Sequence, residues 1–119
     1  MDRACTFCYT HIETVAHLFF QCPNTGKIWN EICLWLGVKQ HITTLAAAVK
    51  CFKKFYAGAR IKSKAVRIAM CCTVHTIWKA RNKLVFEKKA TPSNEIFLQI
   101  KLLTYKVLYS LYPPDFITF

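Results

Sequence analysis

Three cysteines and one histidine near the start of the chain have the types and spacing to bind one metal ion. They are Cys5, Cys8, His17 and Cys22, in the pattern C-x2-C-x8-H-x4-C. Thiolate sulfur and imidazole nitrogen are ligands that Zn²⁺ prefers, and four of them complete the shell of a structural zinc site. The apolar residues 18–20 are expected to pack beneath the ion. Because four protein ligands leave no open position, the pattern predicts a structural zinc ion and not a catalytic one.

The spacing between His17 and Cys22 restricts the backbone that joins them. Five residues along an ideal α-helix turn through about 500°, so the two side chains would point about 140° apart. A regular helix through both residues therefore cannot direct them to one ion. Pro23 relieves this restriction, because the residue before a proline tends to leave the α region. His11 and Cys33 remain the alternative imidazole and thiol ligands.

Length and composition predict one folded domain with reduced thiols. The chain has 119 residues, and 54% of them are hydrophobic, which is enough apolar material for one core. The seven cysteines are an odd number, and the N-terminus shows no apolar signal core. We therefore expect thiols and not disulfides, in the nucleus or cytoplasm. The four cysteines outside the metal pattern are predicted to be small buried core residues: Cys33, Cys51, Cys71 and Cys72.

The positive charge is concentrated in the middle of the chain. The formal net charge is +11, and the stretch from Lys39 to Lys89 holds thirteen Lys or Arg residues and a single acid, Glu87. Such a stretch favours polyanions, nucleic acid before any other. No membrane partner is expected, because the longest mainly apolar stretch, residues 68–78, is far too short to span a bilayer. The predicted phosphate-binding residues are Lys53, Lys54, Arg60, Lys62, Lys64, Arg67, Lys79, Arg81 and Lys83.

Hydrophobic periodicity predicts an all-α fold, a small helical bundle with an N-terminal CCHC zinc knuckle. The predicted helices are 23–36, 44–57, 60–86 and 92–112. Gly37 and Gly58 are expected to end the first two helices, and Pro113 the last. Thr91 is expected to cap the last helix, with Pro92 at its first position.

The helices divide the chain into a zinc-binding segment with the first helix, residues 1–37, and a basic helical region, residues 38–119, within one domain. In the longest helix the nearly continuous apolar run 69–78 predicts burial on most sides. Phe55 and Trp78 are interpreted as core anchors, although aromatic rings beside lysines can also stack on unpaired bases. The buried face of the last helix is predicted to consist of Ile96, Ile100, Leu103, Val107 and Leu111.

No catalytic arrangement is apparent in the sequence. The six acidic residues are scattered and do not form a carboxylate pair, and no glycine-rich phosphate loop is present. Cys71 and His75 lie one helical turn apart, a spacing that a Cys–His nucleophile could use. On an apolar helix this pair is better interpreted as core packing. We therefore predict that the protein is not an enzyme.

Two stretches of the sequence follow a recognisable pattern. The first comprises Cys5-Thr6-Phe7-Cys8, Glu13-Thr14, the H-L-F-F-Q-C run at 17–22 and Ile28-Trp29; the second is the W-x-x-R-N-x-x-x-F run at 78–86. The first resembles the zinc-binding domain that follows the reverse transcriptase in plant LINE-type (non-LTR) retrotransposons, and the second resembles a stretch that often follows this domain, before an RNase H-like domain. The resemblance implies that Cys5, Cys8, His17 and Cys22 bind the metal. It also implies nucleic-acid handling within a retroelement polyprotein, with a reverse transcriptase as a partner.

Three hypotheses follow for the function. The first is a zinc-stabilised module that binds RNA or single-stranded DNA, derived from a retroelement polyprotein. The second is a protein–protein interaction module, which would use the apolar faces of 60–86 and 92–112. The third is an inert retroelement remnant that folds without a selected role.

Overall fold

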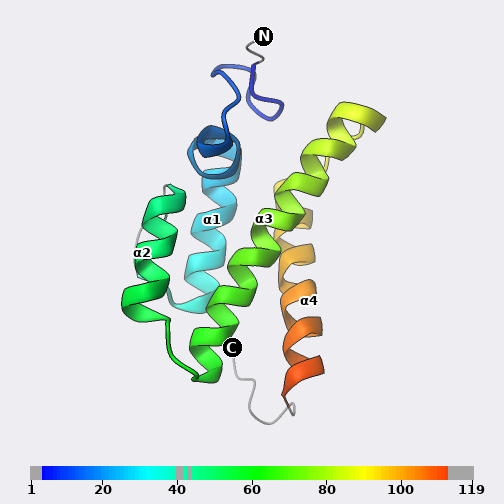
Figure 1. The fold of residues 1–119 in the computed structure, drawn as a ribbon. Coiled ribbons are helices and arrows are strands. Elements are labelled where there is room, and N and C mark those ends of the chain that lie inside the picture. Colours follow the sequence, from blue (N-terminus) through cyan, green and yellow to red (C-terminus); the bar gives the residue numbers. More distant parts are fainter. Residues whose placement is uncertain (1–3, 40–41, 43, 113–119) are drawn as a thin grey trace.

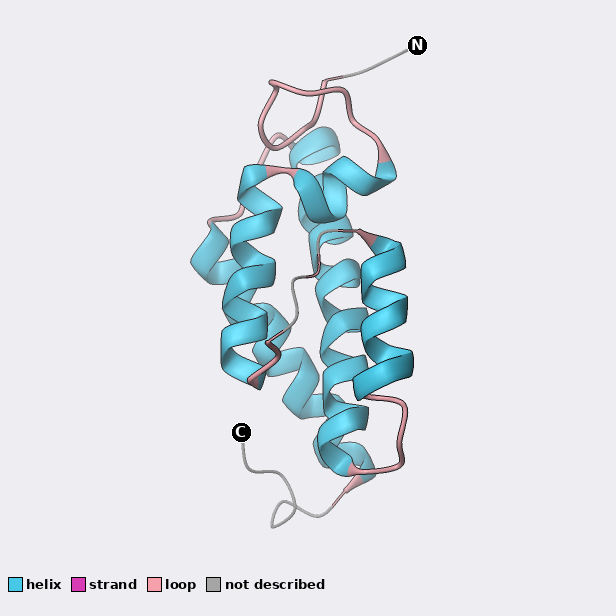
Figure 2. Cartoon of the chain, turned by 90° about the vertical axis from the view of Figure 1, so that its left-hand side faces the viewer, coloured by secondary structure: helices cyan, strands magenta, loops and turns pink. Residues whose placement is uncertain are grey.

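The structure is a computed structural model that describes residues 4–39, 42 and 44–112. Within these residues it contains helices and loops, with one isolated β-bridge between Ala4 and Ile12 (Figure 2). The predicted helical fold class is therefore confirmed. The elements are the π-helix η1 (His17–Gln21) and the α-helices α1 (Pro23–Leu36), α2 (Leu45–Phe55), α3 (Ile61–Glu87) and α4 (Ser93–Leu111).

Helix α1 begins and ends where the sequence predicts. Pro23 occupies its first turn, where a missing N–H leaves no hydrogen bond unmade. Gly37 ends the helix in the left-handed conformation, with φ of 71°, and its N–H donates to the carbonyl oxygens of Cys33 and Leu34. This cap fixes the direction in which the chain leaves α1.

Two other predicted boundaries need correction, and a third lies outside the described residues. Helix α2 ends at Phe55, before Gly58, and its N-cap is Thr44, whose hydroxyl accepts a hydrogen bond from the N–H of Ala47 at 3.0 Å. Helix α4 begins at Ser93, so Pro92 takes the N-cap position that was predicted for Thr91. The helix ends at Leu111, and the predicted stop at Pro113 lies outside the described residues.

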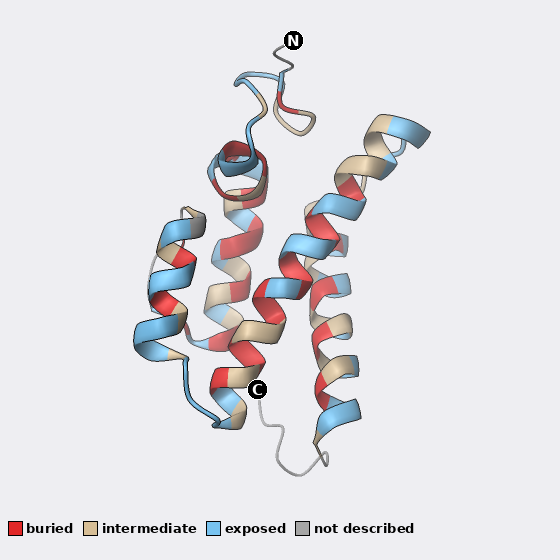
Figure 3. Cartoon of the chain, viewed as in Figure 1, coloured by how far each residue is buried: buried red, intermediate tan, exposed pale blue. Residues whose placement is uncertain are grey.

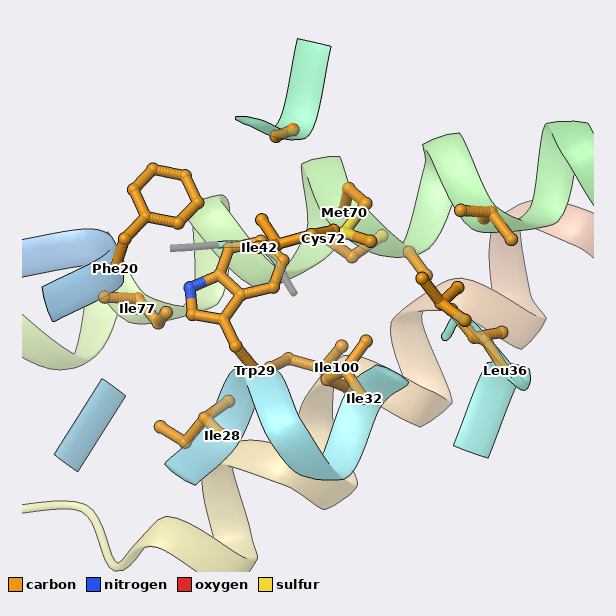
Figure 4. Close-up of a cluster of buried hydrophobic side chains, with 14 of the residues drawn as sticks. Phe20, Ile28, Trp29, Ile32, Leu36, Ile42, Met70, Cys72, Ile77 and Ile100 are labelled. Carbon is orange, nitrogen blue, oxygen red and sulfur yellow. The ribbon is translucent and has the colours of Figure 1, made fainter. Parts of the chain in front are cut away.

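The core lies between α1, α3 and α4, with α3 and α4 packed as antiparallel neighbours (Figure 1). Trp29 and Ile32 from α1 meet Ile77 from α3 and Ile100 from α4 in this core, and Phe20 of η1 closes it at one end (Figure 4). Two further buried residues, Ala48 and Cys51, bring the apolar face of α2 to the same cluster. The metal segment therefore rests on the end of a continuous core.

Helix α3 has a buried and an exposed side, which corrects the prediction that residues 69–78 are buried on most sides. Ala69, Met70, Cys72, Thr73, Thr76 and Ile77 are buried, whereas Cys71, Val74, His75 and Trp78 are exposed (Figure 3). The interpretation of Cys71 and His75 as core packing is therefore wrong. Helix α3 packs against α1 and α4, so the residues that face these two helices are buried and the residues on the other side stay exposed.

Two further burial predictions are wrong. Phe55 and Trp78 are exposed and do not anchor the core. In α4 the buried side consists of Ile96, Ile100, Thr104 and Leu108, whereas Leu103 and Val107 are half-buried and Leu111 is exposed. Thr104 can be fully buried because its hydroxyl donates to the carbonyl oxygen of Ile100 at 2.7 Å. Within the described residues no helix is long and apolar enough to cross a membrane.

We expect Gly37→Ala to lower the free energy of unfolding by about 1–2 kcal/mol, because an L-residue in the left-handed region is strained. An added Cβ would meet only the Nζ atom of Lys62, at the ordinary contact distance of 3.5 Å, so the loss comes from the backbone. Urea denaturation measures it. Gly58→Ala is the matched control, because Gly58 lies outside that region with its nearest neighbouring atom at 4.0 Å. An equal effect in both variants would contradict this account.

Candidate metal centre

The first two ligand candidates lie on a closed loop that precedes the helices. The N–H of Cys5 donates to the carbonyl oxygen of His11 at 2.7 Å, and the N–H of Tyr9 donates to the carbonyl oxygen of Cys5 at 2.9 Å. Tyr9 takes a left-handed conformation, with φ of 60°, which tightens the turn. The amide of Asn24 ties this loop to α1 by donating to the carbonyl oxygen of Phe7 at 2.9 Å. Cys5 and Cys8 are therefore held on one short turn next to the N-terminal end of α1.

The other two candidates lie at the ends of a single π turn. The N–H of Cys22 donates to the carbonyl oxygen of His17, five residues earlier, at 2.7 Å. This wider turn brings residues with a spacing of five toward the same side, as an α-helix cannot. Cys22 itself is extended, with φ of −63° and ψ of 135°, as expected before Pro23. The sequence predicts that Cys22 leaves the α region before Pro23, but it does not predict the π turn. The H-x4-C spacing nevertheless matches the bond from the N–H of Cys22 to the carbonyl oxygen of His17.

The four predicted residues converge. The ligand atoms of Cys5, Cys8, His17 and Cys22 all lie within 4.8 Å of one another, and the Cys8 Sγ and His17 Nε2 atoms are 3.3 Å apart. In a tetrahedral zinc site, bonds of about 2.3 Å to sulfur and about 2.0 Å to nitrogen separate the ligand atoms by about 3.5–3.8 Å. The cluster is therefore close enough to hold a metal ion after small side-chain movements.

Apolar residues enclose one side of the cluster. Cys5 and Cys22 are fully buried and pack with Leu18, while Cys8 lies on the more open side. Phe20 instead reaches the main core and stacks on Trp29, with ring centroids 5.2 Å apart. Leu18 and Phe19 therefore pack beneath the site as expected, whereas the expectation for Phe20 is wrong, because its ring belongs to the main core.

The two sides of the cluster differ in thiol acidity. Burial raises the pKa of Cys22 to about 11. Hydrogen bonds from Thr10, and then one with His11, lower the pKa of Cys8 to about 5. At neutral pH Cys8 is therefore a thiolate, whereas Cys22 must release a proton when a metal ion binds.

The alternative ligands occupy other positions. His11 is exposed and stacks on the ring of His17, with centroids 4.8 Å apart, and its Nδ1 lies 3.9 Å from the Cys8 sulfur. Cys33 lies on α1, outside the group of converging ligand atoms, where burial raises its pKa to about 11. The geometry thus favours His17 and Cys22 over His11 and Cys33.

A single carboxylate connects the metal loop to α3. One oxygen of Glu13 accepts hydrogen bonds from the N–H and hydroxyl of Thr6, at 2.8 and 2.6 Å. The other oxygen accepts from Nε of Arg81 at 2.8 Å and forms an ion pair with its NH2 nitrogen at 2.8 Å. Thr6 lies between the two loop cysteines, so this contact links the ligand turn directly to α3. The sequence does not predict the contact between Glu13 and Arg81, although both residues lie in the stretches on which the resemblance rests.

Burial alone would raise the pKa of Glu13. The hydrogen bonds from Thr6 and Arg81, together with the charge of Arg81, outweigh burial and hold this pKa below its usual range. The ionised carboxylate is thus the form that the fold stabilises.

The predicted phosphate-binding residues form two groups along α3. Lys53, Lys54, Arg60, Lys62, Lys64 and Arg67 gather where α2 ends and α3 begins; Lys79, Arg81 and Lys83 lie in the second half of α3. Six of the nine side chains are exposed, the exceptions being Lys64, Arg67 and Arg81. Arg67 donates to the carbonyl oxygens of Ala57 and Gly58, both at 3.3 Å, and Arg81 is held by Glu13.

Comparison with known proteins gives no match to any family model, curated protein or solved structure. The inference of function therefore depends on the geometry and charge of this chain and on the resemblance of its N-terminal pattern.

We expect Glu13→Gln to lower the free energy of unfolding by about 1–3 kcal/mol at pH 7, because it removes charged hydrogen bonds in a half-buried site. The lowered pKa means that this contribution is present above the ordinary carboxylate pKa and is lost as the pH falls through the folded-state value. The difference between wild type and variant should therefore shrink on acidification. Urea denaturation from neutral to acidic pH measures it.

Glu87→Gln is the matched control, since Glu87 is an exposed carboxylate at the end of α3. We expect it to change stability by less than about 0.5 kcal/mol. A Glu13→Gln penalty that stays constant down to acidic pH would argue against the ionised carboxylate as its source.

Proposed function

We propose that the chain is a zinc-stabilised module that binds RNA or single-stranded DNA. The observation that carries the proposal is the convergence of Cys5, Cys8, His17 and Cys22, whose ligand atoms lie within 4.8 Å of one another. Three thiols and one imidazole are a soft donor set that suits Zn²⁺ better than Mg²⁺ or Ca²⁺. Four ligands satisfy the ion, so its role is structural, and the function that we propose is binding and not catalysis.

The charge distribution supports a polyanionic partner. The net charge is +11, and the exposed lysines Lys53, Lys54, Lys79 and Lys83 lie in both basic groups. Of two acids beside the second group, Glu13 is already paired with Arg81, and Glu87 lies one turn after Lys83. Phosphates can therefore approach the first group without a competing carboxylate on α2 or in the first half of α3, whereas at the second group they compete with Glu87.

The resemblance to the zinc-binding domain of plant LINE-type retrotransposons adds to this proposal. It supports derivation from a retroelement polyprotein and a reverse transcriptase as a partner. Such a role places the chain in the nucleus or cytoplasm, where its thiols stay reduced.

A second candidate function is protein–protein interaction, and α4 favours it. Leu98 and Leu102 are exposed one turn apart, and Tyr109, on the same side of α4, extends this apolar surface toward the end of the helix. Such residues are enriched where surfaces associate. A molecular mass that rises with protein concentration would support this candidate.

We expect purified protein to contain about one zinc ion per chain, and Cys22→Ser and His17→Ala to lose it together with helicity. The physical reason is that a structural zinc ion supplies folding free energy that the small N-terminal loop lacks. Elemental analysis and circular dichroism measure both properties.

Cys71→Ser is the matched control, because Cys71 is an exposed cysteine outside the metal cluster. It should retain the metal and the helicity. A folded, metal-free wild type would remove the zinc from the proposal.

Binding to single-stranded nucleic acid should weaken steeply as salt rises. Each phosphate neutralised on a single strand contributes about 0.7 log units of affinity per tenfold change in salt. The double variant Lys53→Gln/Lys54→Gln should therefore weaken binding and reduce the salt dependence by up to about 1.4 log units. Fluorescence anisotropy with labelled oligonucleotides at several salt concentrations measures both effects.

Lys27→Gln is the control, because Lys27 is exposed on α1, outside both basic groups. It should leave the salt dependence almost unchanged. An affinity of the wild type that does not depend on salt would count against phosphate contact.

A further inference from the structure

Trp78 is one of three large apolar side chains of α3 that are exposed, together with Val74 and Phe86. Its side chain is 45% exposed, whereas the adjacent Ile77 is fully buried. A buried tryptophan removes 150–250 Å² from water, roughly, and is a major stabiliser of a core. The fold forgoes much of this gain at Trp78, so the position of the indole calls for another explanation.

Two neighbouring side chains hold the indole in place. The ring of Phe19 from η1 lies against it, with centroids 6.2 Å apart and planes tilted by 31°. The guanidinium carbon of Arg81 lies 5.1 Å from the indole centroid, within cation–π range. Arg81 is itself fixed by its ion pair with Glu13. The indole is thus exposed and pre-organised, which lowers the entropy that a ligand must remove on binding.

The half of α3 that carries Trp78 has a net positive charge. Lys79 and Lys83 are exposed there and line one pocket together with Glu87, and His75 is exposed one turn before Trp78. The nearby carboxylate of Glu13 is engaged by Arg81 and Thr6. An exposed aromatic ring beside cations is the combination that proteins use on single strands, where bases stack and phosphates pair with lysine.

We propose that Trp78 is a stacking site for one unpaired base of RNA or single-stranded DNA, with Lys79 and Lys83 contacting the flanking phosphates. This inference rests on the proposed nucleic-acid function and assigns a specific contact to it. Duplex DNA offers no free base face, so the site selects single strands. An exposed tryptophan could also contact a protein partner, but the excess of cations near Trp78 favours a nucleic-acid backbone.

The test separates base stacking from phosphate attraction. Anisotropy is measured with labelled oligo(dT) and with an abasic oligonucleotide of the same length. Wild type should bind oligo(dT) more tightly. Trp78→Leu, which keeps an apolar side chain against Phe19 but removes the aromatic face, should weaken oligo(dT) binding about tenfold and leave abasic binding unchanged. Trp78→Phe should retain most of the affinity.

Tyr109→Ala is the matched control, because Tyr109 is an aromatic residue of similar exposure, 49%, on α4. It should bind both oligonucleotides as wild type does. Zinc content and helicity verify that each variant is folded, and Trp78→Met, which also lacks an aromatic face, serves if Trp78→Leu does not fold.

The remaining outcomes overturn one proposal or both. If wild type binds both oligonucleotides equally and Trp78→Leu has no effect, the stacking site is wrong and the phosphate-binding function stands. If Trp78→Leu weakens binding to both oligonucleotides equally, the contact is not base stacking, and the inference fails. If wild type binds neither, the proposed function fails as well, and Trp78 becomes a candidate contact for a protein.

Discussion

The hydrogen bond from the N–H of Cys22 to the carbonyl oxygen of His17 determines whether this chain has a metal centre at all. In an α-helix the side chains of His17 and Cys22 would point in different directions, and the π turn that this bond closes brings them to the same side. Pro23 has no N–H to donate to the carbonyl oxygen of Phe19, four residues earlier, and this oxygen instead accepts from the indole N–H of Trp29. The same turn directs the ring of Phe20 onto Trp29. The turn that brings the candidate ligands together thus also packs against the core of α1.

Glu13 connects the loop that carries Cys5 and Cys8 to α3. Its two oxygens satisfy Thr6 in the ligand loop and Arg81 on α3, so the loop is held by a helix 68 residues later in the chain. Arg81 in turn lies over Trp78. A half-buried carboxylate is stable here because both oxygens have charged or hydrogen-bonding partners. This chain of contacts is the physical route by which order in the metal loop reaches the surface that we propose binds a base.

The sequence predicted what depends on local chemistry. Pro23 and Gly37 placed α1 correctly because each acts on its own backbone, and the Cys and His spacing located the cluster. It failed where neighbours decide the outcome. An apolar run such as 69–78 does not reveal how many helices will cover it, so Trp78 was expected in the core and is exposed. The contact between Glu13 and Arg81 has no local signature, since its two residues are far apart in sequence and only packing brings them together.

The strong positive charge of the chain explains why the candidate metal cluster and the ion pair of Glu13 with Arg81 matter for stability. With a net charge of +11 the chain repels itself, and the cations of the two basic groups lie at the end of α2, at the N-cap of α3 and along α3. In the N-terminal loop Cys5 is buried with Leu18 and Cys22, and Phe7 packs against the main core. Three thiolates around a divalent ion would carry a net negative charge at that end, and Glu13 already neutralises Arg81 there. With an ion bound, negative charge would therefore lie inside the fold beside the N-terminal loop, while most lysines of the two basic groups stay exposed. A polyanion bound to those lysines would relieve the remaining repulsion, so the charge that weakens the free fold is the charge that a phosphate backbone can use.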